Sequence, residues 1–503
     1  MGTVSATKRD VISRAFSSCI DGFEGRLVLL ESSKQNSLPQ IQITGLPNEV
    51  VQESRERVKA SLLQLGFSVP SQKLLVHLSP AETKKSGSHF DLPIAMTLLT
   101  LEGFFPTNQI ERTAFLGELS LGGKVRPVKH LIPLLDPLIR NEQIERILVP
   151  KENQEEAALF RSSKVFLCED LREAIGFCFQ KQILQNTEQP LPANKPHPSF
   201  LTFDSILGQR MAKRVLIISL AGNHPLLLEG PPGSGKTLLA NCTPSLLPSL
   251  SEAEILEVSR IYSLGGIERA HNPAPPFRSP HHSISAAAFL GGGSGQVLPG
   301  EISFAHRGVL FLDELPEFRR DAIEGLREPL QDGKIHLHRI SQSIRLPANF
   351  RLIAAMNPCR CGYSGNQFRT CSCSAESLRS YRKRLSGPIL DRFPLYFWLE
   401  ATKTKLAAEG ASHSEAREAI GKVHPILALE QPANEDLTAL QKRLNRSASL
   451  WLRNLEEKTS LSFRRLSNLL KVSRTIALLD ERESIESIDL EEAWNLRSPE
   501  VLT

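Results

Sequence analysis

Long apolar segments are absent from this sequence. It holds no run of about 18 apolar residues, the length at which a membrane-spanning helix is expected. The segment Met1–Asp10 lacks the apolar core of a secretory signal, and Ala6 stands where a myristoylation signal needs Ser or Thr. No internal repeat of about 20–50 residues is found either, which argues against a repeat array. We therefore expect a cytoplasmic protein with no membrane partner.

A strong charge of one sign is also missing. The 503 residues carry a formal net charge of +5, a mildly basic balance that permits nucleic-acid binding without demonstrating it. Hydrophobic residues make up 41% of the chain and charged residues 23%, which is typical of folded globular proteins and argues against disorder. This length predicts about three domains.

The cysteines are unevenly placed. Four are isolated, and we expect them to be plain buried thiols: Cys19, Cys168, Cys178 and Cys242. The other four crowd into one short segment: Cys359, Cys361, Cys371 and Cys373. In a cytoplasmic protein such a cluster indicates a metal before a disulfide, and four thiolates can complete a tetrahedral Zn²⁺ site with no open position for catalysis. Because C-x-C is tighter than the common C-x-x-C spacing, four reduced thiols in a loop remain the alternative.

A proline-rich stretch divides the chain. Residues 186–200 combine prolines with polar spacers and are expected to be a linker. Residues 1–185 before it mix strand and helix patterns, with strands at 41–44 and 74–78 and a helix at 50–65. The remaining chain divides into an α/β core over 201–400 and a helical domain over 401–503.

Three apolar runs in the core each end on a polar residue. They are 226–228 before Glu229, 309–312 before Asp313, and 352–356 before Asn357. Their alternation with helical patterns predicts a parallel α/β sheet with its site at the carboxyl ends of the strands. In the helical domain one apolar stripe is expected, with four polar residues away from it. The stripe is Leu461, Leu466, Leu469, Leu470 and Ile476, and the polar residues are Arg464, Ser467, Lys471 and Arg474.

The strongest motif follows the first of these strands. It matches G-x-x-x-x-G-K-[ST] in full: Gly230, Pro231, Pro232, Gly233, Ser234, Gly235, Lys236 and Thr237. Glycines let the backbone N–H groups face phosphate oxygens, and the helix that follows adds its positive end. Lys236 would reach the β- and γ-phosphates of ATP, and the Thr237 hydroxyl would hold Mg²⁺. A chance glycine-rich loop is the alternative, which the strand before and the helix after disfavour.

The polar strand ends supply candidate catalytic residues. Asp313 would act on the Mg²⁺, and Glu314 would polarise the attacking water as general base. Asn357 could position that water or sense the γ-phosphate, although an Asn before Pro358 is also typical of a turn.

Two arginines are candidates for stabilising charge on the γ-phosphate. Arg392 could be supplied to a neighbouring subunit, or could form a surface ion pair with Asp391. Arg464 could reach the phosphate from the helical lid, or could belong to a solvated helix face.

Together these motifs resemble the ComM/YifB family of magnesium-chelatase-like AAA+ ATPases, which is tied to natural transformation. The most specific segments are 277–282, 291–293, 299–303 and 308–318, with Asn357-Pro358-Cys359 and 386–392. The resemblance implies a sensor-1 role for Asn357, a finger role for Arg392 and a sensor-2 role for Arg464. It also implies a homo-hexameric ring and DNA branch-migration activity, with an insert near 281–300 and a hairpin near 336–347 facing the pore. One departure is Arg360, where relatives have proline.

The N-terminal part, through segments 45–47, 53–58 and 90–95, is similar to the α+β domain of Lon proteases. Lon-type enzymes need a Ser–Lys dyad. Asp91 falls where the serine should be and Ile132 where the lysine should be, with Ser88 and Lys129 nearby but out of register. We therefore predict no proteolysis and a binding or assembly role for this domain.

Three functions compete at this point. A DNA motor is favoured by the resemblance and by a basic cluster that could equally be a solvated face or a subunit contact: Arg379, Arg382, Lys383 and Arg384. A metal-inserting chelatase subunit or another remodelling ATPase is the alternative, and the N-terminal domain and the cysteines weigh against a chelatase. An ATP-dependent protease is disfavoured by the missing dyad.

Overall fold

The computed structural model describes residues 12–68, 72–187, 201–293, 298–338, 343–366, 368–400, 410–434, 437–459 and 461–497. Its contacts divide the chain into two compact units, which are described separately. The N-terminal unit contains residues 1–195 together with 252–272, and the C-terminal unit contains 196–251 together with 273–503. The segment 252–272 lies within the range that the sequence assigns to the α/β core.

The N-terminal unit is built on a seven-stranded mixed sheet with the order β3-β4-β2-β1-β5-β8-β9. The strands are β1 (Ser13–Asp21), β2 (Glu24–Gln35), β3 (Gln40–Thr44), β4 (Lys73–Ser79), β5 (Thr113–Phe115), β8 (Arg146–Pro150) and β9 (Val165–Cys168). Strands β2 and β1, and β2 and β4, pair antiparallel, whereas β3 with β4 and the run β1-β5-β8-β9 pair parallel. The expected strands at 41–44 and 74–78 are confirmed.

Helices on this sheet bury two separate apolar cores. The helices are α1 (Glu49–Gln64), α2 (Asp91–Leu101), α3 (Leu131–Arg140), α4 (Gln154–Ala158) and α5 (Leu171–Cys178). One core joins α1, α2 and α5 to strands β1 to β4, and the other joins α3 and α4 to β5, β8 and β9. Every residue of helix α2 is buried, as in a central helix, and its residues are apolar except Asp91, Thr97 and Thr100. The helix predicted at 50–65 is confirmed as α1.

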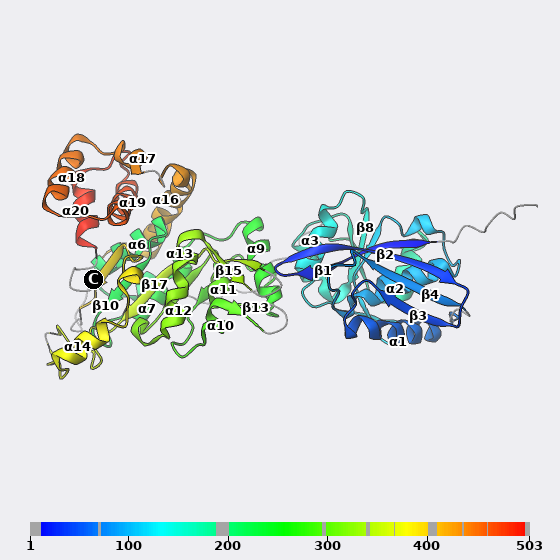
Figure 1. Ribbon diagram of the computed structural model, residues 1–503. Helices are drawn as coiled ribbons and strands as arrows, with labels where there is room; N and C mark the ends of the chain where they lie inside the picture. Colours follow the sequence, from blue (N-terminus) through cyan, green and yellow to red (C-terminus); the bar gives the residue numbers. More distant parts are fainter. Residues whose placement is uncertain are drawn as a thin grey trace, which may run out of the picture. The chain divides into compact units, whose positions relative to one another are not determined.

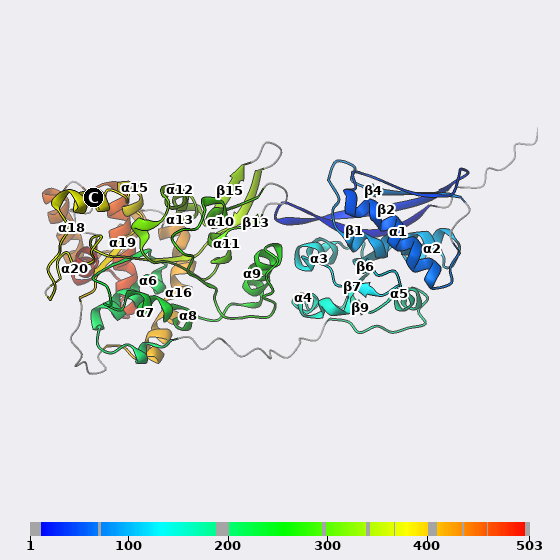
Figure 2. The ribbon, with the colours of Figure 1, turned by 90° about the horizontal axis from the view of Figure 1, so that it is seen from below.

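One helix that follows the P-loop in sequence also belongs to the N-terminal unit. Helix α9 (Glu252–Leu264) packs beside α3 (Figures 1 and 2). Arg260 on α9 lies 3.1 Å from a carboxylate oxygen of Asp136 on α3, and both side chains are largely buried. His271 donates through Nε2 to the carbonyl oxygen of Glu155 at 2.7 Å. The unit therefore includes a piece of chain that leaves the C-terminal unit and returns to it.

The C-terminal unit holds a five-stranded sheet with the order β11-β14-β17-β10-β18, parallel throughout. The strands are β10 (Leu226–Glu229), β11 (Phe277–Arg278), β14 (Val309–Leu312), β17 (Arg351–Met356) and β18 (Leu395–Trp398). Strands β10, β14 and β17 are buried along almost their whole length, as expected for a parallel sheet covered on both faces. The three strands predicted from the apolar runs are confirmed, and their carboxyl ends meet at one edge.

Helices cover this sheet and extend into a helical domain (Figure 1). Beside the sheet lie α6 (Arg210–Gly222), α7 (Lys236–Asn241), α10 (Ala286–Leu290), α11 (Glu301–Phe304), α12 (Arg320–Glu324), α14 (Ala375–Arg382) and α15 (Gly387–Leu390). The helical domain contains α16 (His413–Asn434), α17 (Leu437–Gln441), α18 (Arg446–Lys458), α19 (Phe463–Leu479) and α20 (Ser487–Asn495). One apolar core joins α6 and the sheet to α16, α19 and α20.

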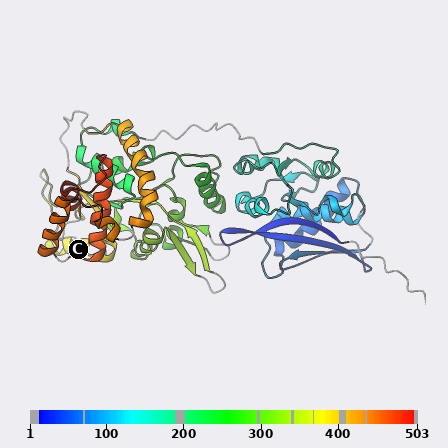
Figure 3. The same cartoon turned by 90° about the horizontal axis from the view of Figure 1, so that it is seen from above.

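Two hairpins leave the sheet. Strands β12 (Gly291–Gly292) and β13 (Leu298–Pro299) form the stem of the first. Strands β15 (Lys334–His338) and β16 (Ser343–Pro347) form the second, which extends from the body of the unit in yellow-green in Figure 3. The hairpin predicted near 336–347 is thus confirmed.

One prediction about the helical domain is wrong. Arg474 was expected on the polar side of α19, but its side chain is 4% exposed. The guanidinium donates through Nη2 to Glu430 on α16 at 2.9 Å and through Nη1 to the carbonyl oxygen of Glu483 at 2.6 Å. Helical spacing placed this residue away from the apolar stripe, and a partner on another helix neutralises it inside the core.

Candidate functional site

The P-loop connects β10 to α7, and its glycines are required at their positions for different structural reasons. At Gly230 a Cβ atom would lie 2.4 Å from the carbonyl oxygen of Leu399, so any side chain would clash with the end of β18. Gly233 and Gly235 have φ angles of 78° and 96°, which glycine adopts without steric cost. The loop conformation therefore depends on these glycines.

Lys236 lies inside the loop. Its ammonium group donates to the carbonyl oxygens of Gly230 at 2.7 Å and Pro231 at 3.0 Å, and to Oδ1 of Asn357 at 3.3 Å. Burial lowers the pKa of Lys236, and the carboxylates of Asp313 and Glu229 oppose that shift. An anionic phosphate beside this ammonium would stabilise its charged form.

The loop also contains a buried polar atom that fits an additional ligand. The hydroxyl oxygen of Ser234 is buried and has no hydrogen-bond partner among the described residues. A buried hydroxyl without a partner costs about 1–3 kcal/mol. A phosphate oxygen within the loop would satisfy it, so the residues present fit a nucleotide phosphate.

Thr237 and Asp313 meet across the sheet edge. The hydroxyl of Thr237 donates to Oδ2 of Asp313 at 2.8 Å. The other carboxylate oxygen of Asp313 accepts from the backbone N–H of Glu314 at 2.9 Å. A hydroxyl and a carboxylate oxygen are ligands that Mg²⁺ prefers, so this pair fits the metal that accompanies ATP.

Glu314 has an unusual backbone and a partner that the sequence did not indicate. Its φ angle is 54°, a left-handed conformation that costs a non-glycine residue about 1 kcal/mol. Its carboxylate oxygen Oε2 lies 3.2 Å from Nδ1 of His282. The histidine belongs to the segment 277–282 that carries the family resemblance, but no role was predicted for it.

Asn357 lies next to the lysine of the P-loop. It follows β17, which pairs directly with β10, and its amide oxygen contacts the ammonium of Lys236. The structure thus brings together Lys236, Thr237, Asp313 and Asn357 at the carboxyl edge of the sheet.

Arg392 and Arg464 lie in a second group. Burial lowers the pKa of Arg392, and the charges of Arg464 and Arg327 lower it further. Arg392 donates through Nη1 to the carbonyl oxygen of Pro388 at 2.8 Å, whereas Asp391 contacts Arg465. Among the described residues no hydrogen bond or ion pair joins Arg392 or Arg464 to the P-loop.

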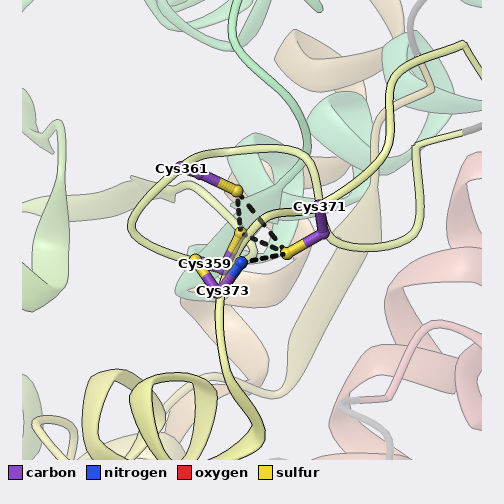
Figure 4. A group of neighbouring side chains, drawn as sticks. All are labelled: Cys359, Cys361, Cys371 and Cys373. Carbon is purple, nitrogen blue, oxygen red and sulfur yellow. Dashed lines mark hydrogen bonds between the residues drawn. The ribbon is translucent and has the colours of Figure 1, made fainter.

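The cysteine cluster follows Asn357 along the chain (Figure 4). The four sulfur atoms all lie within 4.8 Å of one another, and the Sγ atom of Cys359 is 3.3 Å from that of Cys361 and 3.7 Å from that of Cys371. A tetrahedral site with Zn–S bonds of about 2.3 Å places its sulfurs about 3.8 Å apart. All eight cysteines are free thiols, and the four isolated ones are buried as expected.

Backbone N–H groups also donate hydrogen bonds to sulfur atoms of this cluster, as they would to thiolates. The N–H of Ser364 donates to Sγ of Cys359 at 3.3 Å, and that of Cys373 donates to Sγ of Cys371 at 3.4 Å. Hydrogen bonds from the backbone N–H groups of Tyr363 and Ser372 lower the pKa of Cys361 to about 5, whereas burial and hydrogen bonds among the thiols raise the pKa of Cys371 to about 12. Donor type, spacing and hydrogen bonding all fit a structural Zn²⁺ ion.

The dyad positions in the N-terminal unit are both buried. Asp91 begins α2 and accepts from Nε of Arg57 at 2.7 Å, from Nη2 of Arg57 at 3.0 Å and from the backbone N–H of Leu119 at 3.1 Å. Ile132 lies in α3 with 2% of its surface exposed. An ion pair and an aliphatic side chain thus occupy the places where the Lon resemblance puts a nucleophile and its base.

Comparison with known proteins matches this sequence to one family. Three family models cover most of the chain: "Magnesium chelatase, subunit ChlI" over residues 202–406, "Subunit ChlI of Mg-chelatase" over 30–153, and "Magnesium chelatase, subunit ChlI C-terminal" over 414–497. The YifB protein of Salmonella typhimurium is 38% identical over 491 residues, which cover 94% of each chain. The chain belongs to the magnesium-chelatase-like ComM/YifB family.

Two further relatives extend this result. The "Competence protein ComM" of Haemophilus influenzae is 36% identical over 493 residues, 95% of this chain and 96% of that protein. Lon protease 2 of Bacillus subtilis is 26% identical over 242 residues, 43% of this chain and 40% of that protein, so the Lon similarity is partial. The P-loop unit has an α/β fold with a parallel sheet. Among the described helices of the chain, none combines the length and apolarity needed to cross a bilayer.

Proposed function

We propose that this chain is an ATP-hydrolysing motor that acts on DNA as a homo-hexameric ring in the cytoplasm. Its activity is branch migration or helicase action during recombination in natural transformation. The contact that carries the proposal is the one between Thr237 and Asp313, because it joins the P-loop to the acidic strand end needed for Mg²⁺-dependent hydrolysis. The family membership supports the same ATPase chemistry.

Each residue of the site has a separate task in this proposal. Lys236 binds the β- and γ-phosphates, Thr237 and Asp313 hold Mg²⁺, and Asn357 positions the attacking water or senses the γ-phosphate. Glu314 accepts a proton from that water as general base. ATP supplies the phosphoryl group, and the bound Mg²⁺ neutralises charge on its phosphates.

The arginine group supports action between subunits. Three guanidinium groups near one another repel, so an anionic partner would stabilise them. Because Arg392 makes no contact with its own P-loop among the described residues, we propose that it serves the phosphate of a neighbouring subunit, while Arg464 reaches the phosphate from the helical lid. A ring supplies such a neighbour at every interface.

The four residues of the basic cluster have different surroundings in the structure, and these surroundings decide which of them we propose as DNA contacts. Arg384 forms an ion pair with Glu317, and Arg382 is half-buried. Arg379 and Lys383 are exposed and line an open groove beside Phe318. We propose that these two residues contact DNA phosphates, which predicts binding that weakens steeply as salt rises.

A chelatase-like or other remodelling ATPase is the second candidate. The descriptions of the matching family models favour it, since all three name a magnesium chelatase subunit. Such an enzyme would hydrolyse ATP through the same site but would not respond to DNA.

Steady-state ATP hydrolysis distinguishes these functions. We would measure it without DNA, with a single-stranded oligonucleotide and with a four-way junction, using the wild type, Glu314→Gln and the control Glu317→Gln. The motor proposal expects stimulation by DNA, and a loss of about 10²–10⁴-fold in Glu314→Gln with nucleotide binding retained. A rate indifferent to every DNA would favour the chelatase-like function, and no hydrolysis in any condition would contradict both.

A further inference from the structure

The loop that carries the four clustered cysteines packs against the P-loop. It runs from the end of β17 at Met356 to the start of α14 at Ala375. At Gly362 of this loop a Cβ atom would lie 2.7 Å from both Cγ and Cδ of Pro232, the third residue of the P-loop. Such a distance leaves no room for a side chain, so the bare backbone of the cysteine loop lies directly on the proline ring.

The same part of the chain contacts the P-loop at two further points. The backbone N–H of Gly230 donates to the carbonyl oxygen of Met356 at 3.3 Å. The amide oxygen of Asn357 lies 3.3 Å from the ammonium nitrogen of Lys236. Together with the proline contact, residues 356–362 therefore support the P-loop at its start, in its middle and at its lysine.

Two of the cysteines belong to this supporting segment. The backbone N–H of Gly362 donates to the carbonyl oxygen of Cys359 at 3.0 Å, which closes a tight turn, and Gly362 has a left-handed φ of 82°. The sulfur of Cys361 in the same turn lies 3.5 Å from that of Cys371 on the returning side of the loop (Figure 4). The position of Gly362 is thus determined by the residues that gather the sulfurs.

The cysteine loop has little else to fix its shape. Its described residues form no helix or strand, and among those of 360–374 Gly362 is the only buried one. A loop without a core of its own has many accessible conformations, and a cross-link between its two sides reduces their number. Four thiolates around one metal ion supply such a cross-link. The support that segment 356–362 gives to the P-loop therefore depends on the state of the cysteines.

We propose that the cysteine loop, held by a metal ion on its four thiolates, positions the P-loop for nucleotide binding, so that metal loading sets the affinity for ATP and ADP. Gly362 is a positioning residue in this proposal, because it acts through Pro232 and not on the nucleotide. The inference rests on the nucleotide site of the proposed function and is independent of any action on DNA.

The first test measures nucleotide affinity and metal content together. The full chain is titrated with mant-ADP, a fluorescent ADP analogue, in excess Mg²⁺, before and after treatment with TPEN, a chelator that binds Zn²⁺ far more tightly than Mg²⁺. We expect the dissociation constant to rise by about tenfold as zinc is lost, and to recover when Zn²⁺ is restored. Hydrogen exchange of residues 230–237 should become faster in the zinc-free protein.

A second test addresses the contact itself with the metal in place. Gly362→Ala adds a methyl group that overlaps the ring of Pro232, so we expect the dissociation constant for mant-ADP to rise by about tenfold while zinc is retained. The control is Gly365→Ala, which has a similar φ of 74° in the same loop but whose Cβ would meet Trp398, at 3.3 Å, and not the P-loop. It should stay within about twofold of the wild type.

A double variant separates this contact from general damage to the loop. Pro232→Ala removes the ring atoms that the added methyl would strike. Gly362→Ala combined with Pro232→Ala should therefore bind mant-ADP no more weakly than Pro232→Ala alone. Fully additive losses in the double variant would overturn the proposed contact.

The other outcomes separate this inference from the proposed function. An affinity that does not change when zinc is removed would overturn the inference, and so would a metal-free wild type. A zinc-dependent affinity with ATP hydrolysis indifferent to DNA would support the inference and contradict the motor. A wild type that binds no nucleotide would overturn both.

Discussion

The hydroxyl of Thr237 lies 2.8 Å from a carboxylate oxygen of Asp313, although 76 positions separate the two residues in sequence. Strand β17 stands between β10 and β14 in the sheet, so this bond spans the ends of three strands. The contact depends on the parallel arrangement, which places all three carboxyl ends at one edge. We therefore expect the Mg²⁺ dependence of hydrolysis to rely on both residues.

Loss of either oxygen ligand should weaken Mg²⁺ use. In Thr237→Ala and Asp313→Asn we expect the Mg²⁺ concentration for half-maximal ATP hydrolysis to rise by about tenfold, as expected when one ligand worth ~1.4 kcal/mol is lost. The control is Thr243→Ala, because the hydroxyl of Thr243 donates to the backbone carbonyl of Ala240 within its own helix turn, away from Asp313. Titration of Mg²⁺ against hydrolysis is the measurement, and an unchanged midpoint in both variants would contradict the assignment.

Arg392 should act on the neighbouring subunit's nucleotide. We expect Arg392→Ala to lower kcat by about 10³-fold, the effect of losing an arginine finger. Lys236→Ala should be equally inactive, because it cannot bind phosphate. The Arg392→Ala subunit keeps an intact P-loop, and the Lys236→Ala subunit keeps an intact Arg392. In mixed rings the two would meet at some interfaces, so mixing should restore part of the activity. A mixture as inactive as its components would argue against action between subunits; Arg465→Ala serves as the control.

The cysteine cluster should hold about one Zn²⁺ per chain, as a closed four-thiolate site does. Metal analysis by mass spectrometry of the purified full chain tests this expectation. Cys361→Ser should lose the metal and unfold at a lower temperature, because binding to such a site stabilises the fold. The control Cys242→Ser removes an isolated buried thiol and should keep the zinc. Metal-free wild-type protein would favour four reduced thiols.

The N-terminal unit should lose stability in mild acid. Burial lowers the pKa of His89 to about 4, and its Nε2 atom donates to the carbonyl oxygen of Ser18 at 2.8 Å. The unfolded histidine binds a proton near pH 6.5, so the stabilisation is complete above that pH and is lost as pH falls toward 4, by about 2 kcal/mol at pH 5. Hydrogen exchange in β1 and α2 between pH 7 and pH 5 measures it. His89→Gln should show a weaker pH dependence, and an equal dependence would point to other groups.

Sequence patterns predicted most of the fold because the strands concerned are buried on both faces. Strands β10, β14 and β17 are continuous apolar runs, and a polar residue marks each carboxyl end. The P-loop was recognisable because its spacing is a direct requirement of phosphate binding. The contact between Lys236 and Asn357 follows from two strand ends at one edge, so it too could be anticipated.

Other features depend on partners that are remote in sequence. Arg474 has helical spacing typical of a solvated position, and its burial is explained by Glu430 on another helix and by the carbonyl oxygen of Glu483. His282 carries no signal of its contact with Glu314, since that contact requires β11 to pair with β14. The position of Arg464 relative to Arg392 likewise depends on α19, whose Arg465 and Asn468 contact Asp391 at the end of α15. No local pattern contains such information.

The docking of α9 means that the two units share three chain crossings, at the linker and at both ends of the segment 252–272. A protease that cuts within 188–200 would release no free N-terminal piece, because α9 would still be bound through Arg260 and Asp136. Conversely, a shortened protein that starts at residue 201 would expose the face of α9 that α3 normally covers. The N-terminal unit therefore needs both of its chain segments, and a severed linker should be detectable on a denaturing gel but not by size under native conditions.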